Sequence, residues 1–391
     1  TYYTSARHFG DDIKQVEPTF MASAPRLWES LHHRIVTGVR KAHPVRRGLF
    51  HIALFLGLHY RDTWFALRGE DLRLRPPSRA RLLGQKLLAA LKWLLLLPWY
   101  GFFNAAVLEP VRQKAGGSLK GTISGGGALS PAIDRFFNAI GIPVLEGYGL
   151  TETSPVVAVR TRQRLVCGTV GPPIPQTEVR IVDPETGAIL FPDPEAPHEG
   201  RGKRGEIQIR GPQVMPGYFK DTEATAEVLD ADGWFRSGDL GMMTFNDALK
   251  ILGRCKATIV LNNGENVEPE RIELRLKLIP LVAECVVVGQ DAKHLGALIL
   301  PDLKACREAG FVGESVAELV RQPGLRDRVQ KEIRKAMADP AAFRRFEVVH
   351  DIRFLEKPLE VGVELTNLFK LKRHAIHERY ADLIREMTEA R

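Results

Sequence analysis

GTISGGGALSPAIDRFFNAIGIPVLEGYG, from Gly121 to Gly149, decides the fold class. A β-type run at 120–124 leads into three consecutive glycines, a helix-like run follows at 131–140, and a second β-type run covers 142–149. Strands that alternate with helices in this way predict an α/β sheet. Glycines directly after a strand permit a tight turn and a close approach of the backbone to a ligand.

The segments on the C-terminal side of this stretch predict two further regions. Short β-type runs separated by turn signals dominate residues 168–251, which predicts a β-rich subdomain. After Arg254 the α/β pattern returns, with a helix whose first turn holds Pro269. Beyond it we expect strands at 283–290, 296–302 and 346–355, and helices at 324–338 and 374–387.

Length and composition are those of an ordinary globular protein. The chain has 391 residues, is 44% hydrophobic and 26% charged, and carries 55 Lys and Arg against 47 Asp and Glu, a net charge of +8. These values exclude a disordered, collagen-like or disulfide-scaffold protein and predict two or three domains. The positive charge favours anionic partners such as nucleotides, CoA-like phosphates or a membrane surface. We expect no nucleic-acid partner, because the basic residues are dispersed and form no recognition motif.

The cysteines and the N-terminus bear on localisation. The four cysteines, at 167, 255, 285 and 306, form no C-x-x-C pair, so a zinc site is not expected and a reducing compartment fits best. The N-terminal residues are too polar for a signal peptide. We therefore expect a cytoplasmic protein, located at the inner face of the membrane if the segment described next contacts lipid.

Residues 82–108 form the most hydrophobic stretch of the chain. Its uncharged part, between Lys92 and Glu109, is 16 residues long, whereas a membrane-spanning helix needs about 20. Pro98 is expected to interrupt it. Basic residues precede it and Trp and Tyr lie within it, a pattern typical of a helix in the bilayer interface. A buried core helix is the alternative.

Two motifs near the central strands could bind a nucleotide. SGGGALSP, at Ser124–Pro131, offers backbone N–H groups to an anion or to the edge of a planar ring, but it is not a Walker-type phosphate loop. EGYGLTETSP, at Glu146–Pro155, combines an aromatic ring, a hydroxyl and a carboxylate that could stack, bind phosphate and hold Mg²⁺. Taken alone, each is also an ordinary turn.

Three later motifs are equally ambiguous in isolation. In GWFRSGDLG, at Gly233–Gly241, Asp239 could accept hydrogen bonds from ribose hydroxyls or simply occupy a turn. Residues 252–273 begin LGRCK and continue with a glycine turn, which also fits a linker followed by a helix cap. In ELTNLFKLKR, at Glu364–Arg373, a lysine lies between apolar residues, and Lys372 and Arg373 are expected to form a solvated basic face.

The order of these motifs is specific where the single motifs are not. SGGGALSP, YGLTE, RSGDL, GRCK with GENVEP, and a late FKLKR together resemble the adenylate-forming superfamily of acyl-CoA synthetases. The closest resemblance is to bacterial long-chain fatty-acid–CoA ligases of the AMP-forming type. FMASAPRLWESLHHRI, at Phe20–Ile35, is similar to the family's VPR-x-WE helix segment, so the resemblance covers essentially the whole chain.

The resemblance implies an architecture and a cofactor set. It implies a partial N-terminal adenylation domain at 1–253, a hinge at 254–256 and a small mobile α+β lid at 257–391. The expected substrates are a fatty acid, ATP and CoA, with Mg²⁺. The roles carried over are adenine and acyl-carboxylate lining (Gly126, Gly127, Ala128), adenine stacking (Tyr148), α-phosphate contact (Thr151), Mg²⁺ binding (Glu152), ribose binding (Asp239, Arg254), hinge (Lys256), pantetheine tunnel (Gly264) and adenylation (Lys370).

The chemistry of the family explains these residue types. A carboxylate attacks the α-phosphorus of ATP and expels pyrophosphate, so a lysine and Mg²⁺ are needed where two anions meet. The CoA thiol then attacks the acyl-adenylate, and the small domain must rotate between the two steps.

The sequence departs from the family pattern in two places. The usual TPT-x-K-L-K-R motif is replaced by TNLFKLKR at 366–373, so the proline and second threonine that support the lysine are absent. The Ser/Thr/Gly-rich phosphate loop that ends in Pro-Lys-Gly is absent as well. We therefore expect an N-terminally truncated chain, opening at Thr1, with weak or no adenylation on its own. The alternatives are an acyl-AMP ligase that uses a carrier-protein acceptor and a non-catalytic, membrane-associated remnant of the fold.

Overall fold

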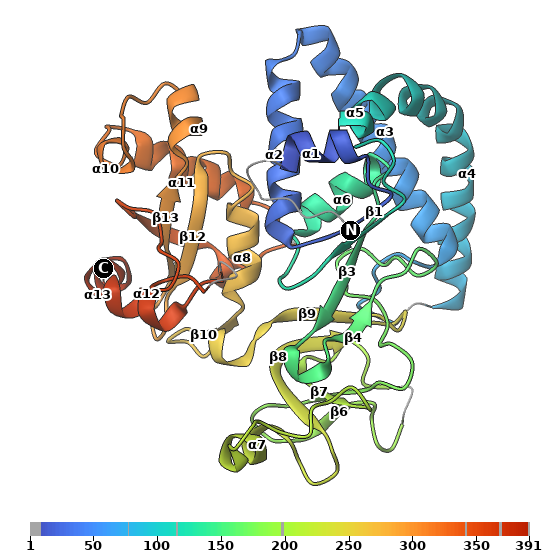
Figure 1. Ribbon diagram of the computed structural model, residues 1–391, viewed down its shortest axis with the longest axis vertical. Helices are drawn as coiled ribbons and strands as arrows, with labels where there is room; N and C mark the ends of the chain where they lie inside the picture. The colour runs from blue at the N-terminus through green and yellow to red at the C-terminus, as the bar shows by residue number, and fades with distance from the viewer. Residues whose placement is uncertain are drawn as a thin grey trace. The chain divides into compact units, whose positions relative to one another are not determined.

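The chain divides into two compact units, residues 1–251 and 252–391. The computed structural model (Figure 1) describes residues 9–76, 78–114, 116–196, 199–340, 342–366 and 370–389. Thr1 and residues 367–369 of the altered lysine motif therefore lie outside the described residues. The predicted α/β class, with a large N-terminal domain and a smaller C-terminal one, is confirmed. That residues 254–256 act as a hinge and 257–391 as a mobile lid stays a prediction.

The first unit contains the predicted strand–glycine–helix–strand arrangement. The parallel strands β1 (Phe20–Ser23), β2 (Gly121–Ser124) and β3 (Val144–Gly149) lie in this order, and β4 (Val156–Val159) pairs antiparallel with β3. Helix α6 (Pro131–Ala139) connects β2 to β3. Trp28, at 0% exposure on α2 (Pro25–Lys41), packs edge-to-face on Phe137 of α6, 5.1 Å between ring centroids.

The predicted β-rich subdomain is a five-stranded sheet of order β6-β5-β7-β8-β9. Its strands are β5 (Glu178–Val182), β6 (Ile189–Phe191), β7 (Gly205–Arg210), β8 (Phe235–Met243) and β9 (Leu249–Arg254). The short helix α7 (Thr222–Val228) lies between β7 and β8 in the sequence. Ile181, Ile207 and Ile209 are fully buried in its core, as alternating apolar residues on one face of each strand require.

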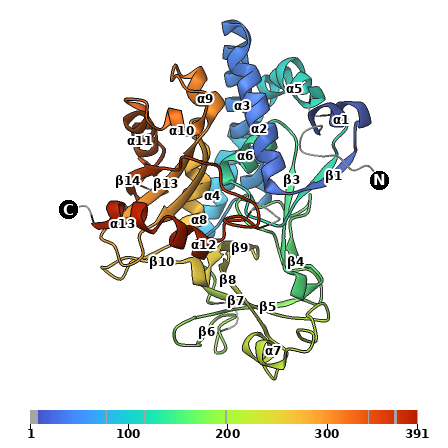
Figure 2. The same cartoon turned by 60° about the vertical axis from the view of Figure 1, so that its left-hand side comes forward.

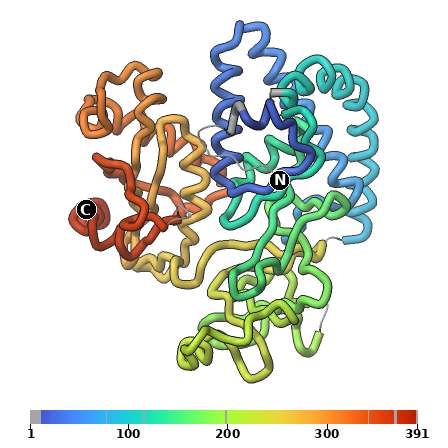
Figure 3. The backbone as a smooth tube through the Cα atoms, viewed as in Figure 1, coloured from blue at the N-terminus to red at the C-terminus, as the bar shows by residue number. Residues whose placement is uncertain are grey.

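Helices α3 (Pro44–Arg68) and α4 (Arg79–Phe103) pack against each other as a helical hairpin (Figure 3). Ser78 caps α4, since its Oγ accepts the N–H of Arg81. The expected interruption at Pro98 is wrong, because α4 runs through it. A proline removes the hydrogen bond to the carbonyl of residue 94, and that residue is two-thirds exposed at the surface. A π-helical segment (Asn104–Leu108) and α5 (Glu109–Lys114) follow.

The alternative of a buried core helix at 82–108 is contradicted in this chain. Ala89 is the buried residue within α4, and most of its leucines are more than half exposed. Among the described residues one helical stretch, 79–113, is long and apolar enough to cross a membrane, and 11% of its most apolar window is buried. Helices in the cores of soluble proteins also pass that test of length and composition, so the test alone does not establish a span.

The second unit is built on a three-stranded sheet (Figure 2). Its strands are β12 (Val282–Val288), β13 (Leu295–Pro301) and β14 (Val349–Phe354). Successive residues of β12 point into two different hydrophobic cores. Val287 packs in the core that contains α8 (Pro269–Leu276) and α11 (Leu325–Ala336), and Val286 packs in the core that contains the C-terminal helices. Pro269 opens α8, as expected. The single predicted C-terminal helix is two, α12 (Arg373–Arg379) and α13 (Ala381–Glu389), which separate at Tyr380.

The remaining elements are short. They are α1 (Phe9–Val16), the 3₁₀ turns Thr151–Thr153, Cys255–Ala257 and Arg345–Glu347, the strands β10 (Ile259–Val260) and β11 (Asn266–Val267), and the helices α9 (Leu303–Glu308) and α10 (Val316–Leu319).

Candidate functional site

The site of the first unit begins at the carboxyl end of β3. Gly149 ends this strand, and a Cβ there would lie 1.6 Å from the carbonyl oxygen of Pro155, so no larger residue fits. A 3₁₀ turn follows, closed by Thr153, whose Oγ1 accepts the N–H of Leu150 at 3.0 Å. This turn leaves the side chain of Thr151 exposed and that of Glu152 half-buried, next to the strand end where open α/β sheets bind ligands.

Tyr148 and Asp239 lie 91 residues apart in the sequence and meet in the structure. The Tyr148 hydroxyl donates to Oδ2 of Asp239 at 2.7 Å. Asp239 is 5% exposed on β8, and its own N–H bonds Oγ of Ser237. The two residues predicted to hold adenine and ribose are therefore fixed against each other.

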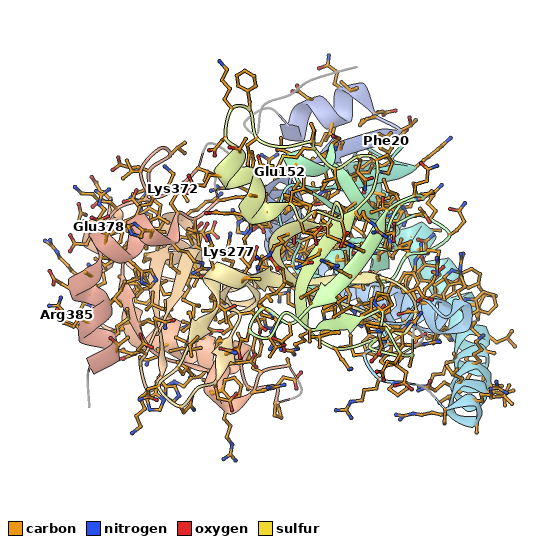
Figure 4. The ribbon with its side chains drawn as sticks, turned by 90° about the horizontal axis from the view of Figure 1, so that it is seen from below. Phe20, Glu152, Lys277, Lys372, Glu378 and Arg385 are labelled. Carbon is orange, nitrogen blue, oxygen red and sulfur yellow. The ribbon has the colours of Figure 1, made fainter. Side chains whose placement is uncertain are left out.

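Glu152 has a partner that sequence reasoning missed. The hydroxyl of Tyr218 donates to Oε1 of Glu152 at 3.0 Å, and the N–H of Met215 donates to the Glu152 carbonyl at 2.8 Å (Glu152 is labelled in Figure 4). Burial and this carboxylate raise the pKa of Tyr218. The signal in the sequence is the turn MPGY at 215–218, which supplies both Met215 and Tyr218.

The glycine loop lies at the end of β2. Gly125 donates its N–H to the carbonyl of Ser23, and Gly126 adopts a φ of +79°, which favours glycine. Gly126 and Gly127 are exposed, Ala128 is half-buried, and the loop closes where the N–H of Leu129 donates to Oε1 of Glu146 at 3.1 Å.

A buried charged cluster beneath this loop was not predicted. Arg160, 1% exposed, donates from Nη1 to Oδ2 of Asp134 and from Nη2 to Oε2 of Glu146, both at 2.8 Å. Burial raises the pKa of Glu146 to about 7, with Arg160 opposing the change and Asp134 adding to it. We call Arg160, Asp134 and Glu146 the buried triad. Their residue types carry no periodic signal, because charged residues are ordinarily placed at the surface.

Three of the predicted site residues lie at the start of the second unit, in or next to its first 3₁₀ turn and the β10–β11 hairpin. Arg254 ends β9, Lys256 lies exposed in the 3₁₀ turn that follows, and Gly264 turns the chain between β10 and β11. Gly264 has a φ of +80° and open space around it, so this turn favours glycine for conformation and not for packing.

Lys370 is exposed, and its backbone is held by Thr366. The N–H of Thr366 donates to the Lys370 carbonyl at 2.8 Å, and the N–H of Lys370 donates to Oγ1 of Thr366 at 3.0 Å. The one threonine of the altered motif therefore supplies polar support to the lysine.

The predicted solvated basic face at 372–373 is wrong. Lys372 donates from Nζ to the carbonyl of Gly362 at 2.7 Å, and Arg373 pairs with Glu273 at 2.6 Å. Glu273 is buried, and burial raises its pKa although Arg373 opposes the change. Both basic residues are thus taken up by the unit's own structure, which leaves Lys370 as the exposed cation of the motif.

Chemically, the first unit offers an aromatic face, a hydroxyl and two carboxylates. No group of three His, Cys, Asp or Glu that could hold a metal occurs in the part of the chain that the structure describes. A single carboxylate such as that of Glu152 suits Mg²⁺, an ion that proteins often bind through one carboxylate together with substrate phosphates.

Comparison with known proteins agrees with the motif order. Residues 2–219 match the model of the AMP-binding enzyme family, and residues 256–391 match that of the AMP-binding enzyme C-terminal domain. The long-chain-fatty-acid–[acyl-carrier-protein] ligase AEE15 of Arabidopsis thaliana is 33% identical over 98% of this chain and 52% of its own length. The long-chain-fatty-acid–CoA ligase FadD15 of Mycobacterium bovis is 34% identical over 74% of this chain and 45% of its own.

A solved structure shows the same fold. The adenylation domain of a carboxylate reductase from Mycobacterium chelonae aligns with a TM-score of 0.66 at 23% identity, covering 98% of this chain and 48% of that domain. The chain spans about half the length of the curated relatives that it matches.

Proposed function

The chain belongs to the AMP-binding enzyme family, and from this we propose that it takes part in ATP-dependent activation of a long-chain fatty acid. In the proposed reaction the carboxylate forms an acyl-adenylate and pyrophosphate, and a thiol then displaces AMP. The observation that carries the proposal is the meeting of Tyr148 with Asp239 beside Glu152, at the carboxyl end of β3. An aromatic ring can stack on a base, a carboxylate can accept hydrogen bonds from ribose hydroxyls, and a second carboxylate can hold Mg²⁺ on a phosphate.

We assign roles to the first unit accordingly. Tyr148 stacks on adenine, and Asp239 accepts the ribose hydroxyls. Thr151 donates to the α-phosphate. Glu152 is the residue that would hold Mg²⁺, which offsets the charge of the phosphates. The loop Gly126–Ala128 lines the adenine and acyl-carboxylate region with its exposed backbone.

The second unit supplies the remaining proposed roles. Lys370 neutralises charge during adenylation, and Arg254 assists at the ribose. Lys256 lies at the hinge, and Gly264 borders the path of the pantetheine arm. The support is their exposure and the backbone geometry of each turn, together with the family match that begins at residue 256.

Two thiols are candidates for the acceptor. We propose CoA, as named for FadD15, while the name of AEE15 specifies acyl-carrier protein. The full-length protein, given ATP, Mg²⁺ and a C16 acid together with equal CoA and holo-acyl-carrier protein, should yield acyl-CoA by mass spectrometry. Acyl-carrier-protein product alone would support the second candidate. Failure to bind ATP at all would support a non-catalytic remnant.

Asp239→Ala should weaken AMP binding by about 10- to 100-fold. A hydrogen bond to a charged group contributes about 1.5–3 kcal/mol, and each 1.4 kcal/mol is tenfold in affinity. Isothermal titration of this chain with AMP measures the effect. Asp232→Ala, in the exposed turn before β8, is the matched control and should leave affinity unchanged. Equal affinities of wild type and Asp239→Ala would remove Asp239 from the nucleotide site.

We further propose that the protein contacts the cytoplasmic face of a membrane through the α3–α4 hairpin. The support is the exposed leucine face of α4, where an amphiphilic substrate would be met. Flotation of the purified chain with lipid vesicles tests it, and a chain that stays in the lower fraction with every vesicle type would refute it.

A further inference from the structure

The outer face of α4 is an unpartnered apolar ridge. Leu83, Leu87, Leu91 and Leu94 recur at helical spacing and are each more than half exposed. Phe55, on the other helix of the hairpin, is also 57% exposed. An exposed apolar surface of this extent marks a site of interaction.

The charge of this segment matches an anionic surface. Residues 72–108 contain six Lys or Arg and no Asp or Glu. Lys86 and Lys92 lie within α4, and the uncharged run after Lys92 is 16 residues, about 24 Å as a helix, against a hydrocarbon thickness of about 30 Å. A helix that crossed the bilayer with this run would place Lys92 in hydrocarbon, so a position in the plane of the interface is favoured.

A cavity of about 250 Å³ opens between α3 and α4 at these two lysines. Its acidic lining residues are already paired, Asp71 with Arg73 at 2.6 Å and Asp62 with Arg135 at 2.5 Å. Lys86 and Lys92 have no ion-pair or hydrogen-bond partner among the described residues. The cavity therefore carries two uncompensated positive charges on the helix that also bears the apolar ridge.

We propose that this cavity takes the phosphate of an anionic phospholipid headgroup while the leucine ridge of α4 rests among the acyl chains. A phosphate offers acceptor oxygens to both ammonium groups. Its attached acyl chains continue the apolar contact. The inference rests on the proposed membrane contact and adds a defined lipid site to it.

The test compares two double variants of the full chain, K86Q/K92Q and R79Q/R81Q. Each removes two positive charges from α4, but only the first pair lines the cavity. Vesicles of phosphatidylcholine alone, and of phosphatidylcholine with 30% phosphatidylglycerol, are used in flotation. Wild type should prefer the anionic vesicles by at least tenfold. K86Q/K92Q should lose about 20- to 30-fold in affinity for them, at about 1 kcal/mol per lysine, and R79Q/R81Q clearly less.

Each other outcome overturns the lipid site in a distinguishable way. Equal losses in both double variants would mean diffuse charge attraction without a site. Wild-type binding to neither vesicle type would remove the membrane contact itself. If 10 mM inorganic phosphate raised the melting temperature as much as the anionic vesicles do, the cavity would be assigned to a soluble anion.

If the chain formed a dimer that L87Q/L94Q abolished, a second copy of the chain would occupy the ridge. Fatty-acid activation in detergent should be the same in wild type and K86Q/K92Q. If neither protein activated a fatty acid, that result would contradict the proposed reaction and leave the lipid site unaffected.

Discussion

Lys370→Ala in the full-length protein should reduce adenylation by about 10²- to 10³-fold, the loss typical of removing one group that stabilises transition-state charge. Lys370 is exposed and its backbone is fixed by two hydrogen bonds with Thr366, so the substitution removes the ammonium group without unfolding the turn. Pyrophosphate release from ATP and a C16 acid measures this half-reaction.

The second half-reaction separates a catalytic role from a structural one. Thioester formation from supplied acyl-adenylate and CoA should proceed at close to the wild-type rate in Lys370→Ala, because the attack of a carboxylate on ATP, at which Lys370 is proposed to neutralise charge, is not part of that step. Lys335→Ala, at an exposed lysine of α11, is the control and should affect neither step. Equal loss of both half-reactions would argue against the proposed role.

Arg160→Met should destabilise the first unit by about 3–5 kcal/mol. The substitution leaves Asp134 and Glu146 buried without their shared cation, and Glu146 also holds the N–H that closes the glycine loop. For a unit of this size the melting temperature should fall by about 6–20 °C. Arg162→Met, at an exposed arginine two residues away, should be nearly neutral.

The loss in Arg160→Met should depend on pH. The folded-state pKa of Glu146 is raised to about 7 from 4.5, so the folded state binds the proton more tightly than the unfolded state does. The contribution of this group to the free energy of unfolding therefore falls as pH rises from about 4.5 to 7.

Without Arg160 the burial of Glu146 beside Asp134 is unopposed, so the pKa of Glu146 rises further and the penalty grows with pH. Urea unfolding at pH 5 and pH 8 should show the larger loss at pH 8. Adding D134N and E146Q to the Arg160 variant should recover most of it. A loss that is equal at both pH values would show that missing packing, and not unpaired charge, is the cause.

Much of the fold could be predicted from the sequence because periodicity and turn residues are local signals. The run at 121–149 predicted two strands and a helix that the structure contains, and Pro269 marked the first turn of α8. The expectation for Pro98 was wrong, because α4 continues through it at a position where residue 94, which loses its hydrogen bond, is exposed, and exposure is a tertiary property.

The sequence was enough to name the residues of the candidate site, but not to predict which of them contact one another. Tyr148, Glu152 and Asp239 were named from their motifs, but their contacts join residues up to 91 positions apart. Tyr218 and Arg160 were not predicted, because a turn residue and an isolated arginine gain their importance only from partners that folding brings to them.

The sequence by itself determined the family, the order of the motifs and the positions of the turns, since these depend on residue types at fixed spacing. Only the tertiary structure decided which side chains meet, that a charged triad lies beneath the glycine loop, and that α4 presents leucines to the surface. The physical reason is that burial and charge pairing depend on contacts between distant segments, and the apolar run at 82–108 is equally compatible with a core and with an exposed face.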